Sequence, residues 1–196
     1  QHAHNVASFL PMPKADISMP LRLVAYFMRG PPGCGKSTAA RHILAQHLSA
    51  QGIKLTPQAA EAAFLPIYRA FIHSTDDYFT KFKETGDAEY QYDPAFLQEN
   101  HARNRARTEA AMRLSLTPLI IDNTNTALWE MRDYIKLADK FHYEVRIIDP
   151  LSVDSEALNP DHLFMRCQQA TLDRPRGKDI GYNVFERMSR NFEPVL

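Results

Sequence analysis

One stretch of the sequence has the residue types and spacing of a phosphate-binding loop. It runs Gly30-Pro31-Pro32-Gly33-Cys34-Gly35-Lys36-Ser37 and fits the pattern G-x-x-x-x-G-K-[ST]. The glycines let the backbone turn its N–H groups toward phosphate oxygens, and Lys36 can reach the β- and γ-phosphates. Ser37 offers a hydroxyl to Mg²⁺, and the following helix directs its partially positive end at the nucleotide. We therefore expect the loop and Thr38 to bind ATP with Mg²⁺; the alternative is a glycine-rich turn that binds nothing.

Two aspartates have the chemistry to complete such a site. Asp122 ends the apolar run Leu119-Ile120-Ile121, like the acid that holds Mg²⁺ directly or through water in many P-loop proteins. Asp76 follows a second apolar stretch and suits a carboxylate that aligns an acceptor hydroxyl and takes its proton. Both have an alternative interpretation as caps of the following turn. Asn123 and Asn125, which follow Asp122, could do either job.

Strands and helices must alternate to position these residues. We expect the first strand at 22–29 and the first helix at 36–50, which Gln51-Gly52 would end. The later elements are expected as follows: a short helix 57–68 ended by Pro66, a strand 69–74, a loop 80–93, a long helix 94–116, a strand 118–122, a helix 127–140 capped by 123–126, a strand 142–148, a loop 150–160, and helices 161–172 and 180–192.

This alternation predicts an α/β fold, a P-loop NTPase-type parallel sheet with helices on both faces. In such sheets the ligand binds beyond the carboxyl ends of the strands. Gly30, Asp76 and Asp122 all fall at such ends. We therefore expect three distant parts of the sequence to converge on one edge of the sheet.

Length and composition limit the class of protein. With 196 residues we expect one P-loop domain over 21–196, preceded by an irregular proline-containing arm at 1–20. Lys plus Arg and Asp plus Glu number 23 each, so a nucleic-acid partner would have to be held by a local basic cluster. The sequence has no apolar run long enough for a membrane span, and the eight histidines have no zinc-ligand spacing.

The two cysteines, Cys34 and Cys167, indicate whether the protein works in a reducing or an oxidising compartment. A disulfide at Cys34 would obstruct nucleotide access to the loop, so we expect a reducing, intracellular location, cytoplasmic or nuclear. The chain starts at Gln1 rather than Met, which fits a fragment of a longer protein.

Several motifs together resemble the polynucleotide-kinase-like P-loop family. The motifs are Arg29 with the phosphate loop, Ser74-Thr75-Asp76-Asp77-Tyr78-Phe79, Tyr90-Gln91-Tyr92-Asp93, Ile120-Ile121-Asp122-Asn123-Thr124-Asn125 and Trp129-Glu130-Met131. Over about 22–192 the sequence is most similar to the kinase module of the Nedd-binding proteins, and more loosely to the kinase-like domain of the myelin cyclic-nucleotide phosphodiesterase. The resemblance implies transfer of the ATP γ-phosphate to a 5′-hydroxyl, with Asp76 as base and Asp122 as the acid after the third core strand.

The sequence departs from this family at two places. Phage-type polynucleotide kinases have an arginine for the acceptor phosphate three residues after the base, where this chain has Phe79. An apolar ring does not bind phosphate by charge, which leaves the acceptor open. The family's C-terminal lid, which places an arginine over the transferring phosphoryl group, is longer than usual here and has Cys167 in place of an asparagine. The basic residues that fall on this segment are Arg166, Arg174, Arg176 and Lys178, with Arg174 and Arg176 as the two catalytic candidates; the alternative is a solvated basic loop.

The long helix carries His101, Asn104 and Arg107 at a spacing that keeps them near one face. The resemblance implies that they could line an acceptor groove together with Asp77, Asn123 and Asn125, whereas a solvated helix face is the alternative. We expect Trp129 to lie in the core.

The sequence thus predicts a Mg²⁺-ATP-dependent kinase with a nucleic-acid or nucleotide-like acceptor. Two alternatives stay open: a small-molecule kinase of the sugar-nucleotide or antibiotic type, and a nucleotide-gated binding module with little catalysis.

Overall fold

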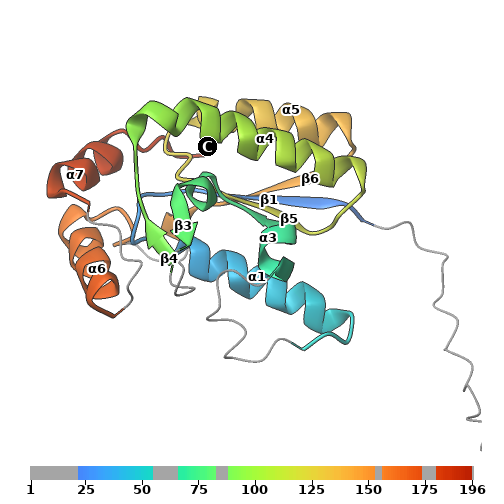
Figure 1. Cartoon of the computed structure of the whole chain (residues 1–196), viewed down its shortest axis with the longest axis horizontal. Helices are drawn as coiled ribbons and strands as arrows, with labels where there is room; N and C mark the ends of the chain where they lie inside the picture. Colours follow the sequence, from blue (N-terminus) through green and yellow to red (C-terminus); the bar gives the residue numbers. More distant parts are fainter. Residues whose placement is uncertain (1–21, 55–65, 83–87, 153–155, 174–179, 196) are drawn as a thin grey trace, which may run out of the picture.

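Four parallel strands form the central sheet in the order β2-β5-β1-β6 (Figure 1). The computed structural model describes residues 22–54, 66–82, 88–152, 156–173 and 180–195. The strands are β1 (Val24–Met28), β2 (Ile72–His73), β5 (Leu119–Asp122) and β6 (Glu144–Ile148). The predicted α/β class with a parallel sheet is confirmed. In the described part of the chain, no helix has the length and apolar character needed to cross a membrane.

Helices cover both faces of this sheet. Figure 1 shows α1 (Lys36–Ala50) and α3 (Pro66–Phe71) on one face, and α4 (Leu97–Arg113) and α5 (Arg132–Lys140) on the other. Because side chains alternate along a strand, β1 divides its residues between two cores. Phe27 packs on the α4–α5 side and Tyr26 packs on the α1–α3 side. A strand buried on both faces reads as a continuous apolar run, which is why β1 and β5 are visible in the sequence.

The remaining elements gather where the strands end. A two-stranded antiparallel hairpin, β3 (Thr80–Phe82) and β4 (Ala88–Tyr90), lies there with α6 (Pro160–Asp173) and α7 (Tyr182–Arg190) (Figure 1). Short 3₁₀ turns connect the larger elements: η1 (Thr75–Phe79), η2 (Pro94–Phe96), η3 (Leu128–Met131) and η4 (Pro150–Ser152).

Several predicted element boundaries were wrong. Pro66 begins a helix instead of ending one, which is sterically allowed because the first helical residue needs no N–H partner. Residues 66–71 are therefore helical, and the second strand shrinks to Ile72–His73. Part of the predicted 80–93 loop is the β3–β4 hairpin, whose three-residue strands are too short to produce a periodic pattern. The predicted arm at 1–20 and most of the predicted helix at 57–68 lie outside the described residues.

Candidate nucleotide and acceptor site

The phosphate loop connects β1 to α1 and has a backbone that only glycine adopts readily. Gly30, Gly33 and Gly35 have φ angles of 119°, 81° and 93°. At Gly33 a Cβ atom would also lie 2.8 Å from the carbonyl oxygen of Leu163, so α6 packs directly against the loop. A residue with a side chain at Gly33 would strain the backbone and push α6 away.

Lys36 lies across this loop. Its Nζ donates a hydrogen bond of 2.9 Å to the carbonyl oxygen of Pro31 and lies 3.9 Å from Sγ of Cys34. The ammonium group therefore stays on the loop instead of extending into solvent. Ser37 and Thr38 in the first turn of α1 are exposed, so their hydroxyls are accessible to a ligand.

Asp122 lies beside the start of the phosphate loop. It is the register partner of Met28, the last residue of β1, and it is buried. The next turn is joined to the loop, since the N–H of Gly30 donates to the carbonyl oxygen of Thr124 over 2.7 Å. The structure thus brings the carboxylate at the end of β5 to the same edge as the loop.

Asn123 and Asn125 do not cap the following helix, so that prediction was wrong. Asn123 Oδ1 accepts a hydrogen bond from the N–H of Thr75, and Asn125 Nδ2 donates to the carbonyl oxygen of Met28. Both asparagines are buried and use their amides to join the ends of neighbouring strands. The cap is instead formed by Glu130, whose carboxylate accepts from the N–H of Ala127.

Asp76 lies in η1, directly after the short strand β2. The N-cap of η1 is Ser74, whose Oγ accepts from the N–H of Asp76. The Asp76 carboxylate accepts a hydrogen bond of 2.9 Å from the hydroxyl of Tyr90 on the hairpin. Burial, and then the Asp76 carboxylate, raise the pKa of Tyr90, which keeps this phenol a donor at neutral pH. The contact was not predicted, although Tyr90 belongs to a motif that carried the family resemblance.

The sheet fixes how Asp76 stands relative to the phosphate loop. His73 of β2 is the register partner of Ile121 in β5, and β5 pairs in turn with β1. The two groups therefore lie at the same edge, separated by two strand spacings of about 4.8 Å each. The predicted convergence of Gly30, Asp76 and Asp122 on one edge is what the structure shows.

Arg107 and Asp77 form an ion pair next to this edge. Their side chains approach to 2.9 Å, and Arg107 also donates to Oδ1 of Asn104 over 2.8 Å. Asn104 is fully buried and donates to the hydroxyl of Tyr134, so it lies behind Arg107 and not on a groove surface. His101 contacts the hydroxyl of Thr75 over 3.2 Å, and burial lowers the pKa of His101. The three helix residues therefore have different contacts. Asn104 supports Arg107, whereas Arg107 and His101 contact η1 or the residue before it.

A buried arginine anchors the C-terminal segment to the start of the loop, a role that the sequence pattern did not predict. Arg29 donates to the backbone carbonyl oxygens of Asn125, Thr126 and Glu193 over 2.6–2.9 Å. Its guanidinium lies 4.5 Å from the ring centroid of Phe192. Only the position of Arg29, between an apolar strand and a glycine loop, could have signalled its burial.

Two further predictions concern the lid arginines and Trp129. Arg174 and Arg176 lie outside the described residues, and Arg166 is exposed on α6. Trp129 is 66% exposed, so its predicted place in the core was wrong. The 3₁₀ turn η3 directs Met131 inward and leaves Trp129 on the surface.

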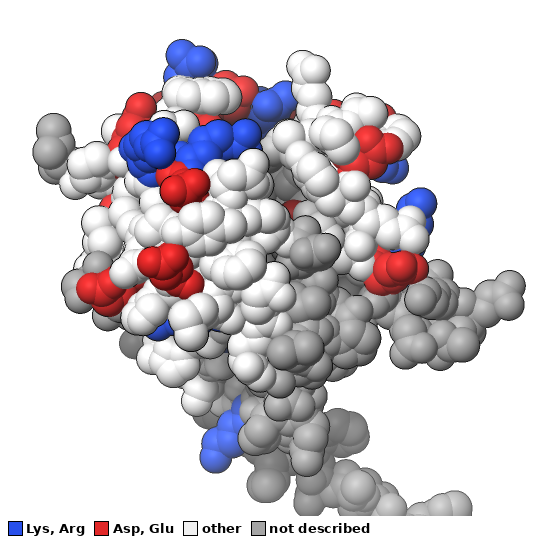
Figure 2. Space-filling model, turned by 90° about the vertical axis from the view of Figure 1, so that its left-hand side faces the viewer, with Lys and Arg blue, Asp and Glu red and all other residues white. Residues whose placement is uncertain are grey.

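Among the described residues, the face that carries the strand ends has no continuous basic stripe. Figure 2 shows Lys and Arg side chains gathered mainly at its upper left, acidic side chains at several other places, and mostly uncharged residues between them. This distribution agrees with the balanced charge of the whole chain.

Comparisons with known proteins agree with the loop geometry. Residues 26–195 match the protein family described as "AAA domain". The human protein NEDD4-binding protein 2 is 35% identical over 128 residues, which make up 65% of this chain but only 6% of the human protein. This chain therefore spans a small fraction of that relative's length, and the likeness supports a P-loop kinase-like family. Because the family match covers most of the chain, this protein belongs to the AAA domain family of nucleotide-binding P-loop proteins.

Proposed function

We propose that this domain is a kinase that uses Mg²⁺-ATP and transfers the γ-phosphate to the 5′-hydroxyl of a nucleic acid or nucleotide. The observation that carries the proposal is the position of the Asp76 carboxylate. It is held by Tyr90 at the same sheet edge as the phosphate loop, two strands away. A carboxylate at the same edge as a triphosphate site can align an acceptor hydroxyl and accept its proton.

The loop would bind the triphosphate of ATP. Its glycine backbone and the first turn of α1 offer N–H groups, and the Lys36 ammonium lies over the loop. Ser37 and Asp122 provide the hydroxyl and carboxylate oxygens that Mg²⁺ prefers, and the buried carboxylate beside the loop fits a cation there. Bound Mg²⁺ would neutralise charge on the phosphate oxygens.

Asp76 would act on the acceptor. The acceptor hydroxyl donates to the carboxylate, and its oxygen attacks the γ-phosphorus. As that bond forms, the bond between the γ-phosphorus and the β-phosphate oxygen breaks, ADP leaves, and the hydroxyl proton passes to Asp76. Arg174 or Arg176 would stabilise the charge of the transferring group. Asp77, His101 and Arg107, near the same edge, would help to place the acceptor, and Asn123 and Asn125 would keep the strand ends in register.

Transfer of labelled γ-phosphate from ATP to an oligonucleotide with a 5′-hydroxyl tests this proposal. Asp76→Asn should reduce turnover by about 10²-fold or more with nearly unchanged ATP binding, because only the proton acceptor is lost. Asp133→Asn is a matched control, since Asp133 forms a surface ion pair with Arg105. Full turnover in Asp76→Asn would reject Asp76 as the base.

A small-molecule kinase is the second candidate, favoured by the burial of the uncharged Phe79 where phage-type enzymes have an arginine and by the net charge of zero. Offering a 5′-hydroxyl oligonucleotide and a sugar nucleotide together with labelled ATP separates the two acceptor classes. A nucleotide-gated binding module would instead bind ATP tightly, phosphorylate neither acceptor and be indifferent to Asp76→Asn.

The location proposed for this protein is a reducing compartment, the cytoplasm or the nucleus. In support, the thiol of Cys34 lies in the loop and contacts the carbonyl oxygen of Arg29 over 3.8 Å. A disulfide at this position would alter the loop that is proposed to bind ATP.

A further inference from the structure

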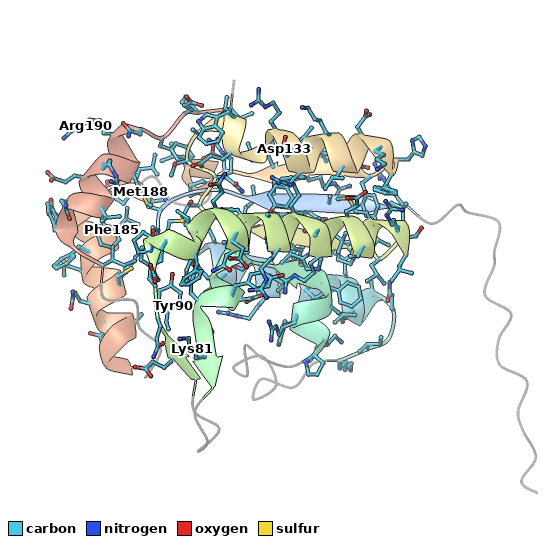
Figure 3. The ribbon with its side chains drawn as sticks, turned by 45° about the horizontal axis from the view of Figure 1, so that its top comes forward. Lys81, Tyr90, Asp133, Phe185, Met188 and Arg190 are labelled. Carbon is cyan, nitrogen blue, oxygen red and sulfur yellow. The ribbon has the colours of Figure 1, made fainter. Side chains whose placement is uncertain are left out.

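Three aromatic rings lead from Asp76 to the surface. The Phe79 ring is buried, with its centroid 6.1 Å from that of Tyr90 and 5.1 Å from that of Tyr92. The N–H of Gln91 donates to the carbonyl oxygen of Phe79 over 2.8 Å, which fixes the end of the hairpin against η1. Figure 3 shows Tyr90 and Lys81 on this hairpin below α4. The result is a continuous path of rings that begins at the proposed base.

Tyr92 is the surface member of this path. It is 54% exposed although it packs on Phe79, so part of its ring is accessible to a ligand. An aromatic side chain held by a buried neighbour loses little conformational freedom when a second ring stacks on it. Tyr92 therefore has the properties of a stacking platform, and it is connected to the proposed base Asp76 through Phe79 and Tyr90.

Basic side chains of α4 contact η1, the turn that contains Phe79. The guanidinium groups of Arg103 and Arg107 both lie 5.4 Å from the ring centroid of Tyr78 in η1. Arg107 is paired with Asp77 at 2.9 Å, whereas the Arg103 side chain is 59% exposed and lies 4.0 Å from Glu99. Stacking rings combined with arginine are typical of sites for single-stranded nucleic acid.

We infer that Tyr92 stacks on the 5′-terminal nucleobase of a single-stranded acceptor, with Arg103 against the phosphates that follow. The inference rests on the proposed kinase function and specifies its acceptor. Phe79 cannot hold an acceptor phosphate by charge, so the terminal nucleotide is recognised through its base. A sugar acceptor without an aromatic ring would gain nothing from Tyr92.

Two oligonucleotides that differ only at the 5′-terminal nucleotide test the inference. One has a normal base and the other has an abasic residue with the same 5′-hydroxyl. For the unmodified protein, kcat/KM should be about 10- to 100-fold higher with the base present, the usual range for one base stacked on an aromatic side chain. Tyr92→Ala should reduce this ratio to near one, and Tyr92→Phe should retain it.

The control is Tyr182→Ala, which removes an exposed tyrosine from the start of α7. It should keep the ratio of the unmodified protein. Circular dichroism of Tyr92→Ala checks the fold, and retention of the ratio in Tyr92→Phe keeps the test valid if the alanine variant unfolds.

Equal kcat/KM for the two oligonucleotides in the unmodified protein would overturn the stacking site and leave the kinase function intact. Fluorescence anisotropy with the same oligonucleotides separates the two proposals further. Binding that requires both the base and Tyr92, without phosphate transfer, would support the stacking site and contradict the kinase. Binding and transfer that are both insensitive to the base would reject the inference.

Discussion

The hydroxyl of Tyr90 donates a 2.9 Å hydrogen bond to Oδ1 of Asp76, although the two residues belong to different elements. Tyr90 ends β4 and Asp76 lies in η1, and Thr80 at the start of β3 donates from its side chain to the carbonyl oxygen of Asp76. The orientation of the proposed base therefore depends on the hairpin.

Tyr90→Phe should lower kcat about 10-fold and leave the KM for ATP unchanged. The Phe ring keeps the packing on Phe79, while the donor that orients the Asp76 carboxylate is lost. Steady-state kinetics with a 5′-hydroxyl oligonucleotide measures the effect. Tyr143→Phe is the matched control, because its hydroxyl donates to the carbonyl oxygen of Leu116, away from the site. Equal loss in both variants would mean that the Tyr90 hydroxyl has no specific role.

Lys36→Ala should reduce phosphate transfer by about 10²-fold or more, because the transition-state charge on the β- and γ-phosphates loses its cation. Lys36 contacts only the loop in the described structure, so the free energy of unfolding should change by less than about 1 kcal/mol. Radiolabel transfer and urea unfolding measure the two effects. Lys140→Ala, which removes a surface ion pair with Glu109, should be active.

Arg29→Met should lower the free energy of unfolding by roughly 3 kcal/mol, since several buried backbone carbonyl oxygens lose their donor. Urea denaturation measures the change. Arg22→Met is the control: the Arg22 side chain is 71% exposed and pairs with Glu144 at the surface. That variant should stay within about 0.5 kcal/mol of the unmodified protein. A similarly small change for Arg29→Met would show that the C-terminal segment is not anchored by this residue.

Stability should fall as the pH drops from about 6.5 to about 4 because of His73. Burial first, and then the positive charge of Arg107, lower the pKa of His73 to about 4. Its ring lies between the hydroxyl of Thr108 and the carbonyl oxygen of Ala70. Between these pH values the unfolded chain binds a proton at His73 that the folded chain does not. The free energy of unfolding therefore falls by on the order of 3 kcal/mol in total, and above about pH 6.5 the contribution of His73 is constant.

Urea unfolding between about pH 6.5 and about pH 4 tests whether His73 causes this loss of stability. His73→Gln should have a shallower dependence of unfolding free energy on pH, because the buried titrating group is gone. His42→Gln, at an exposed position of α1, should keep the slope of the unmodified protein. An identical dependence of the unfolding free energy on pH in all three proteins would exclude His73 as the cause of the stability loss.

The sequence alone determined the features that contiguous residues carry. The phosphate loop lies within eight residues, and β1 and β5 are buried on both faces, so their apolar runs were visible without the fold. The edge rule for parallel sheets then placed Gly30, Asp76 and Asp122 together. The chemical roles of Lys36, Asp76 and Asp122 stay predictions.

Only the tertiary structure decided how side chains are paired across elements. Asn125 was expected in a cap and instead joins two strand ends, because the carbonyl oxygen of Met28 lies beside it only after β1 and β5 pair. Tyr90 reaches Asp76 through a hairpin whose strands are too short for a periodic signal. Arg29 is buried because segments about 100 and 160 residues away supply its acceptors. Such contacts depend on which segments meet in space, and no local pattern of residues encodes that.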